Sequence, residues 1–272
     1  MVQQSVSNMS KKLKLDVLGD RMKTYEKLET SSKFIPGLPI YVRIDGRGFS
    51  KFTKQMTRPY DQRLSSLMLA TTEYLVKEFN ATVGYVQSDE ISLVIKNEYE
   101  APATFEGKKQ KLVSTLAASA TAFFNANFEF YFEGKTVSDF SSRLPTFDCR
   151  IFNLPNWDEA TNSILWRYLD ALKNSKQMLA HHYFSHKELQ NLNGKQLIDK
   201  LKLDKNVIWE DYPEFFRAGV LVQRIRTEVQ TENGLVTRHK VAPVRLPLPF
   251  HCLVHAARVR IVSNDFNEEE NV

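Results

Sequence analysis

Cysteine is almost absent from this chain of 272 residues, which contains only Cys149 and Cys252. A disulfide framework needs several cysteines, and a zinc site needs closely spaced cysteine or histidine pairs, so the sequence favours neither. We therefore expect two buried and unlinked thiols.

Long apolar runs are also absent. No stretch approaches the roughly 18 residues that a membrane-spanning helix requires, and the first 15 residues lack the apolar core of a secretory signal. Glycine and proline are scarce, with 10 of each, whereas 42% of the residues are hydrophobic, which argues against disordered and fibrous classes. We expect a soluble, cytoplasmic protein with a sizeable core and no membrane partner.

Charge of one sign is not in large excess, because 37 lysines and arginines stand against 32 acidic residues. The net charge of +5 favours an anionic partner such as nucleic acid only modestly. Composition leaves the function open, so the pattern of residues has to decide it.

Hydrophobic periodicity predicts a strand, a helix, a β-hairpin, a second helix and a strand in the first half of the chain. Their expected ranges are 39–46, 61–79, 82–95, 108–131 and 147–152. This order is the βαββαβ pattern of a ferredoxin-like domain, so the expected fold class is α+β.

The second half is expected to form a helical and hairpin appendage. A helical pattern covers residues 158–183, Ser185 and Glu188 form a capping box that starts a new helix, and Asn233-Gly234 marks a hairpin. We expect a first domain over residues 1–155, with residues 156–272 packed on it as one intimate unit.

Two aspartates stand where the expected sheet would bring them together. Asp45 ends the first strand and Asp89 lies at the tip of the hairpin, and these elements are neighbours in a βαββαβ sheet. Carboxylates from separate elements suit Mg²⁺, and such a pair can hold two ions beside a triphosphate. Side chains alternate along a strand, so Asp89 is the expected ligand and Glu90 an acid outside the ligand set.

Gly46-Arg47-Gly48-Phe49-Ser50 follows Asp45 directly. Two glycines in such a turn let backbone N–H groups approach phosphate oxygens closely. Turns of this kind are common at strand ends, so this signal is weak by itself.

Three segments carrying these residues resemble the catalytic segments of the tRNA-His guanylyltransferase family. They are YVRIDGRGFSKFTK, RPYDQRL and GYVQSDEISLV. A further segment, WRYLDALKNSKQMLAHHYFSHKELQNLNGKQL, is similar to the bacterial and phage members, called guanylyltransferase-like proteins. The resemblance covers roughly residues 15 to 225.

The resemblance implies a polymerase-type palm over residues 1–155 that adds nucleotides in the 3′–5′ direction. It implies activation of an RNA 5′-monophosphate by ATP or GTP, followed by attack of an incoming nucleotide's 3′-hydroxyl. It also implies two Mg²⁺ ions held by Asp45, the backbone of Gly46 and Asp89, with Glu90 as a further catalytic acid, and a homotetramer built as a dimer of dimers. The implied nucleotide-binding residues are Asp45, Gly46, Arg47, Gly48, Phe49, Ser50, Arg58, Ser88 and Asp89.

Departures from the eukaryotic pattern bear on the RNA substrate. Gly48, Phe49 and Ser50 replace an Asn and a Phe-His pair, and Arg58 replaces a lysine, which keeps a cation with different geometry. The segment DALKNSKQM, residues 170–178, replaces H-I-N-N-L-Y-N-T. We therefore expect template-dependent repair of truncated tRNA 5′ ends rather than dedicated recognition of tRNA-His.

Two other functions remain open. A palm-type nucleotide cyclase would use a similar metal pair, but its G-G-D/E-E/D-F hairpin is missing and the basic C-terminal hairpin favours a polynucleotide. A catalytically inactive RNA-binding protein would not need both Asp45 and Asp89. The products formed from labelled nucleotide distinguish all three functions.

Overall fold

The computed structural model describes residues 17–100, 104–231, 234–244 and 250–264. The N-terminal segment in which we expected no secretory signal, and Asn233 of the hairpin turn, lie outside these residues. None of the helices in this part of the chain is both long enough and apolar enough to span a bilayer.

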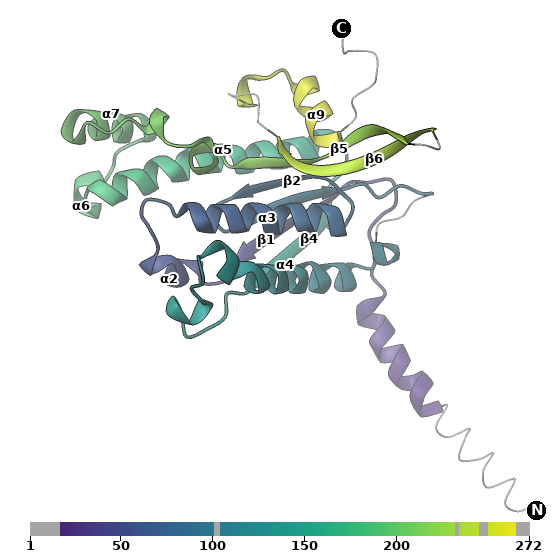
Figure 1. The fold of residues 1–272 in the computed structure, drawn as a ribbon. Helices are drawn as coiled ribbons and strands as arrows, with labels where there is room; N and C mark the ends of the chain where they lie inside the picture. Colours follow the sequence, from purple (N-terminus) through teal and green to yellow (C-terminus); the bar gives the residue numbers. More distant parts are fainter. Residues whose placement is uncertain (1–16, 101–103, 232–233, 245–249, 265–272) are drawn as a thin grey trace, which may run out of the picture.

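A six-stranded antiparallel sheet forms the centre of the molecule, in the order β4-β1-β3-β2-β5-β6 (Figure 1). The strands are β1 Ile40–Gly46, β2 Ala81–Gln87, β3 Glu90–Ile95, β4 Phe147–Asn153, β5 Val220–Thr231 and β6 Gly234–Val244. The first four have the order of a ferredoxin-like domain, so the predicted α+β palm fold is confirmed.

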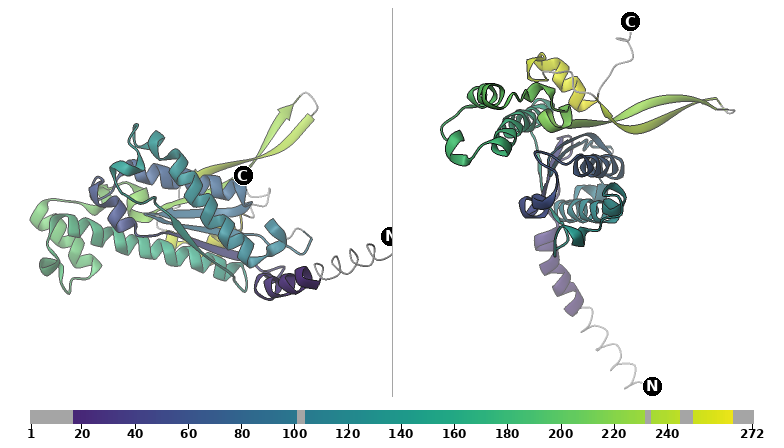
Figure 2. Two further views of the ribbon diagram at one scale, coloured as in Figure 1. Left: turned by 90° about the horizontal axis from the view of Figure 1, so that it is seen from below. Right: turned by 60° about the vertical axis from the view of Figure 1, so that its left-hand side comes forward.

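Helices lie on both faces of the sheet. They are α2 Phe49–Phe52, α3 Gln62–Glu78, α4 Lys109–Tyr131, α5 Trp157–Tyr183, α6 His186–Leu189, α7 Gly194–Lys205, α8 Glu214–Ala218 and α9 His255–Ser263. A further helix covers residues 17–30, and short 3₁₀ turns link several elements. Together α3 and α4 cover one face, and α5 and α9 pack against the other (Figures 1 and 2).

Side-chain alternation in β1 explains why Asp45 lies on the face of the sheet that α5 covers. Ile40, Val42 and Ile44 are fully buried in the core beneath α3 and α4. Tyr41 points to the opposite face, where it packs with residues of α5. Because side chains alternate along a strand, Asp45 lies on the same face as Tyr41.

The N-terminus of α3 is fixed by Asp61, the residue at which the predicted helical range begins. Its carboxylate accepts the backbone N–H of Arg63 at 3.0 Å and that of Thr57 at 3.1 Å. The Arg63 guanidinium also donates to it, at 2.7 Å from Nη2. Burial acts to raise the pKa of Asp61, but these hydrogen bonds outweigh it and hold the pKa below its ordinary value.

The second half of the chain joins the sheet of the first. Strand β5 pairs with β2, from Val83 opposite Gln223 to Val86 opposite Val220, so the predicted hairpin continues the palm sheet. Its two strands extend beyond the other strands (Figure 2). The predicted capping box of Ser185 and Glu188 is present at the start of α6.

The expected burial of both thiols was wrong for Cys252. Cys149 is half-buried on β4, whereas Cys252 is exposed in the 3₁₀ turn Phe250–Cys252. Phe250 fills the core position of that turn and packs on Tyr168, with ring centroids 5.6 Å apart. The residue two positions later therefore points outward.

We expect only Cys252 to react with iodoacetamide in the folded protein. Burial raises the pKa of the Cys149 thiol to about 12, so almost none of it is thiolate near pH 8. Peptide mapping by mass spectrometry after labelling should find the modification at Cys252, and at both cysteines after labelling in urea. Fast labelling of Cys149 in the folded state would contradict this arrangement.

Candidate active site

The backbone joins the two segments that carry the predicted aspartates. Asp45, near the end of β1, pairs in register with Glu90 of β3 and with Asp148 of β4. The N–H of Gly46 donates to the carbonyl oxygen of Asp89 at 3.1 Å. The ends of β1 and of the β2–β3 hairpin are thereby held side by side.

The negative charge of Asp45 acts on the Asp89 carboxylate. Burial raises the pKa of Asp89, and the negative charge of Asp45 raises it further. A divalent cation between the two carboxylates would relieve this repulsion, so the pair fits Mg²⁺ by charge and by ligand type. No cluster of three or more His, Cys, Asp or Glu side chains suited to a metal occurs among the described residues. Any further ligands would be backbone, substrate or water oxygens.

The turn after Asp45 is shaped by Gly46 and Gly48. The N–H groups of Gly46 and Arg47 are used inside the protein, since that of Arg47 donates to Thr146 O at 2.8 Å. Gly48 has a φ of 68° and leads into α2. In the described structure the N–H groups of Gly48, Phe49 and Ser50 have no protein acceptor, so these three, rather than the whole turn, remain for a phosphate.

Phe49 supports this turn from below. Its ring is 2% exposed and packs on Phe52, Phe124 and Phe147, with centroids 5.1 to 5.5 Å apart. A Cβ added to Gly46 would lie 2.6 Å from Phe49 Cγ. The turn therefore depends on a glycine at position 46.

We expect Gly46→Ala to lower kcat by about tenfold or more for the nucleotide addition that the sequence predicts, because the Phe49 ring and the turn must move apart. Steady-state kinetics measures this. Gly19→Ala is the matched control, since a Cβ there meets nothing within 4 Å. Equal activity of both variants and the wild type would show that the turn tolerates the shift.

A cavity of about 290 Å³ opens beside Asp89. Five of the predicted residues line it, namely Phe49, Ser50, Arg58, Ser88 and Asp89. Its other wall comes from α5 and α8, through Ser175, Met178, Phe215 and Phe216. The palm and the second half of the chain therefore enclose it together.

The other predicted residues lie outside the cavity lining. Asp45 and Gly46 occupy the neighbouring strand end, and Arg47 is exposed beside them. Gly48 is exposed at the start of α2. Glu90 is buried at the start of β3 and does not line the cavity.

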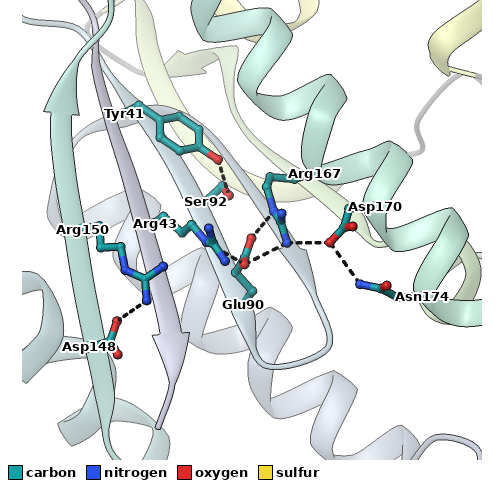
Figure 3. A network of polar contacts seen from close by, with 9 residues as sticks. All are labelled: Tyr41, Arg43, Glu90, Ser92, Asp148, Arg150, Arg167, Asp170 and Asn174. Atoms are coloured by element: carbon teal, nitrogen blue, oxygen red, sulfur yellow. Dashed lines mark hydrogen bonds and ion pairs between the residues drawn. The ribbon is translucent and has the colours of Figure 1, made fainter. Parts of the chain in front are cut away.

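Glu90 is held by two arginines (Figure 3). Arg43 Nε donates to its Oε2 at 2.8 Å, and Arg167 donates through Nε to Oε1 at 2.5 Å and through Nη2 to Oε2 at 2.9 Å. Arg167 also donates to Asp170 at 3.1 Å, and Asn174 donates to the same Asp170 oxygen at 3.0 Å. The acid next to the predicted metal ligand is thus fully engaged within the protein.

Sequence reasoning missed Arg167 and Asp148. Asp148 faces Asp45 across the β1–β4 pairing and forms an ion pair with Arg150, at 3.8 Å between Oδ1 and Nη2 (Figure 3). The only signal available for Arg167 was that an acid buried in a sheet, such as Glu90, needs cationic partners. That requirement does not reveal which residue is the partner, and Arg167 lies 77 positions away on another element.

Comparison with known sequences connects this geometry to one family. Residues 19–155, half of the chain, match the family described as tRNAHis guanylyltransferase. An uncharacterized protein of Acanthamoeba polyphaga mimivirus is 30% identical, over 84% of this chain and 85% of its own length. The tRNA(His) guanylyltransferase of Neurospora crassa is 29% identical, over 73% of this chain and 71% of that protein.

Solved structures agree with the sequence match. A bacterial tRNA(His) guanylyltransferase-like protein in complex with ATP superposes with a TM-score of 0.70 and 37% identity, covering 81% of this chain and 91% of that one. A complex of such a protein with GTP superposes with a TM-score of 0.65 and 35% identity, covering 83% of this chain and 90% of that one. The tRNA(His) guanylyltransferase of Saccharomyces cerevisiae shares the fold, with a TM-score of 0.67 and 23% identity. The superposition covers 84% of this chain and 98% of that one. The chain therefore belongs to the tRNA(His) guanylyltransferase family of nucleotidyltransferases.

Proposed function

We propose that the protein adds nucleotides to the 5′ end of tRNA or a tRNA-like RNA, in the 3′–5′ direction and against a template. The observation that carries this proposal is the meeting of Asp45 and Asp89 beside a cavity enclosed by both halves of the chain. The ATP and GTP complexes of the bacterial relatives support a nucleoside triphosphate as the cavity's ligand.

Asp45, Asp89 and the backbone of Gly46 would hold two Mg²⁺ ions. Bound there, the ions would lower the pKa of an attacking hydroxyl and stabilise the negative charge of the leaving group. The residues' own part is positioning, because the pairing of β1 with β3 and the hydrogen bond from Gly46 N–H to Asp89 O hold the backbone of both aspartates. The fit rests on hard oxygen donors and on the mutual repulsion of the two acids.

The cavity would receive part of a nucleotide. Its volume of about 290 Å³ is near the lower limit of small-molecule sites. The N–H groups of Gly48, Phe49 and Ser50 would face phosphate oxygens, and Arg58 would add a cation at the rim. Arg58 is exposed, and its guanidinium donates to Thr53 O at 3.2 Å. This hydrogen bond holds the guanidinium beside the end of α2.

The RNA would be a truncated tRNA, which makes the enzyme a 5′-end repair enzyme. Support comes from residues 170–178, the segment that departs from the eukaryotic pattern. They lie on α5, where Ser175 and Met178 line the cavity, so the departure falls on the wall of the site.

We also propose a homotetramer built as a dimer of dimers. A monomer in light scattering after size-exclusion chromatography would contradict that assembly.

The test is incorporation of labelled GTP into a 5′-monophosphorylated tRNA that lacks its first nucleotide, with ATP and Mg²⁺ present. The expected product is RNA longer by one nucleotide at its 5′ end, resolved by gel electrophoresis after nuclease mapping. A cyclic nucleotide as the product would replace the proposal with a palm cyclase. Binding of the RNA without any product would point to an inactive RNA-binding protein.

A further inference from the structure

The site contains a third carboxylate, that of Glu90, beside the aspartate pair. Glu90 follows Asp89 directly and stands opposite Asp45 in the β1–β3 pairing. Directly opposed residues in an antiparallel pair lie on one face with Cβ atoms about 5 Å apart. Glu90 is therefore close enough to Asp45 to compete for any cation bound there.

Two guanidinium groups restrain Glu90. They occupy both of its carboxylate oxygens, with three hydrogen bonds of 2.5 to 2.9 Å from Arg43 and Arg167. Both arginines also lie over the ring of Trp166, at 5.8 Å for Arg43 and 4.7 Å for Arg167. The Glu90 side chain is 10% exposed, so the restraint acts away from bulk water and is little screened by it.

Arg167 reaches the sheet from outside it. It lies on α5 with its side chain 9% exposed, and Asp170 and Asn174 stand three and seven positions later on the same helix face. Asp170 accepts a hydrogen bond from Arg167 and another from Asn174 (Figure 3). The orientation of the Arg167 guanidinium is thus fixed by its own helix before it meets Glu90.

We propose that Arg167 is a positioning residue for nucleotide addition, which acts through Glu90. Together with Arg43 it turns the Glu90 carboxylate away from Asp45 and Asp89, so that only two acids bind the divalent cations. This inference rests on the proposed function. Without Arg167, Glu90 keeps one cationic partner, and its carboxylate would turn toward the cation. The cation would then bind more tightly, but displaced from the position set by Asp45 and Asp89.

A purely structural tie between α5 and β3 predicts something different. Loss of such a tie would lower stability and loosen the cation site whether or not position 90 carries a charge. If Arg167 acts through the Glu90 carboxylate, its removal changes cation binding only while that charge is present. Glu90→Gln removes the charge at nearly constant volume and therefore separates the two explanations.

The experiment compares the full-length wild type with Arg167→Met, Arg167→Lys, Glu90→Gln and the double variant Arg167→Met/Glu90→Gln. Calorimetric titration with Mn²⁺ alone measures cation binding without turnover, and steady-state kinetics on truncated tRNA separates kcat from KM. Lys200→Met is the matched control, because Lys200 also pairs with an acid, Asp204 at 2.7 Å, and lies 4.5 Å from the Phe184 ring centroid.

We expect Arg167→Met to bind Mn²⁺ several-fold more tightly, to lose about tenfold or more in kcat, and to keep the nucleotide KM near the wild-type value. Arg167→Lys keeps the charge and should recover part of kcat. The double variant should bind Mn²⁺ like Glu90→Gln alone. If Arg167→Met unfolds at the assay temperature, Arg167→Lys is compared with a second double variant, Arg167→Lys/Glu90→Gln. A shift in Mn²⁺ affinity that is present in Arg167→Lys and absent from this double variant supports the same conclusion.

Unchanged Mn²⁺ affinity in both Arg167 variants, or an affinity shift that persists when position 90 is glutamine, would overturn the inference. An inert wild type on every truncated tRNA would instead count against the proposed function. The Mn²⁺ titrations would still decide the role of Arg167, because they need no RNA.

Discussion

Replacing either aspartate by asparagine is expected to reduce nucleotide addition by about a thousandfold or more while leaving the fold intact. Asparagine keeps the size of Asp45 or Asp89 but removes the negative charge that a divalent cation needs. A loss of roughly 4 kcal/mol of transition-state stabilisation corresponds to about three powers of ten in rate. Single-turnover measurement of 5′ extension at saturating Mg²⁺ is the appropriate assay.

Folding of these variants provides the internal control. Burial and Asp45 both raise the pKa of Asp89, so the ionised pair is under repulsion in the metal-free protein. Asp89→Asn should therefore unfold at the same temperature as the wild type or a higher one. A variant that is both inactive and strongly destabilised would not support a metal-binding role, and a fully active Asp89→Asn would exclude it.

Loss of the Asp61 carboxylate is expected to cost about 2–3 kcal/mol of the free energy of unfolding. Asp61→Ala removes the N-cap of α3, typically about 1 kcal/mol, and leaves the Thr57 N–H and the partly buried Arg63 without their acceptor. Urea unfolding at pH 7 measures the loss. Because Asp61 lines the cavity as well, activity should be recorded separately.

Asp61→Asn divides this effect between the cap and the charge. Its side-chain oxygen still accepts the Arg63 N–H, so the variant should lose roughly half as much stability as Asp61→Ala. The pKa of Asp61 is lowered in the folded protein, so its charge stabilises the fold fully above the ordinary pKa, near 4, and less as pH falls through the lowered value. The difference between wild type and Asp61→Asn should therefore narrow below about pH 4. A constant difference would rule out the charge contribution.

The sheet and the aspartate pair could be predicted because they depend on local patterns. Alternation in residues 39–46 determines which side chains of β1 face α3 and α4. Asp61 and the Ser185 capping box mark helix starts by short-range hydrogen bonds. The convergence of Asp45 and Asp89 then follows from the strand order. Their roles in catalysis stay predictions until the variants are assayed.

The remaining features depend on how distant elements pack. The pairing of β5 with β2 is a contact between segments more than 130 positions apart, and no periodicity in either segment specifies it. The same holds for Arg167, which meets Glu90 only because α5 crosses that face of the sheet. Cys252 was misjudged for a related reason, since Phe250 took the core position of the turn.

The cavity described above has two walls with separate origins. Asp89, Phe49 and Ser50 belong to the palm, whereas Met178 and Phe215 belong to α5 and α8. Substitutions in the second wall leave the hydrogen bond between Gly46 and Asp89 untouched. Under the proposed function, substitutions in the second wall would change nucleotide preference in this chain while leaving the aspartate pair in place.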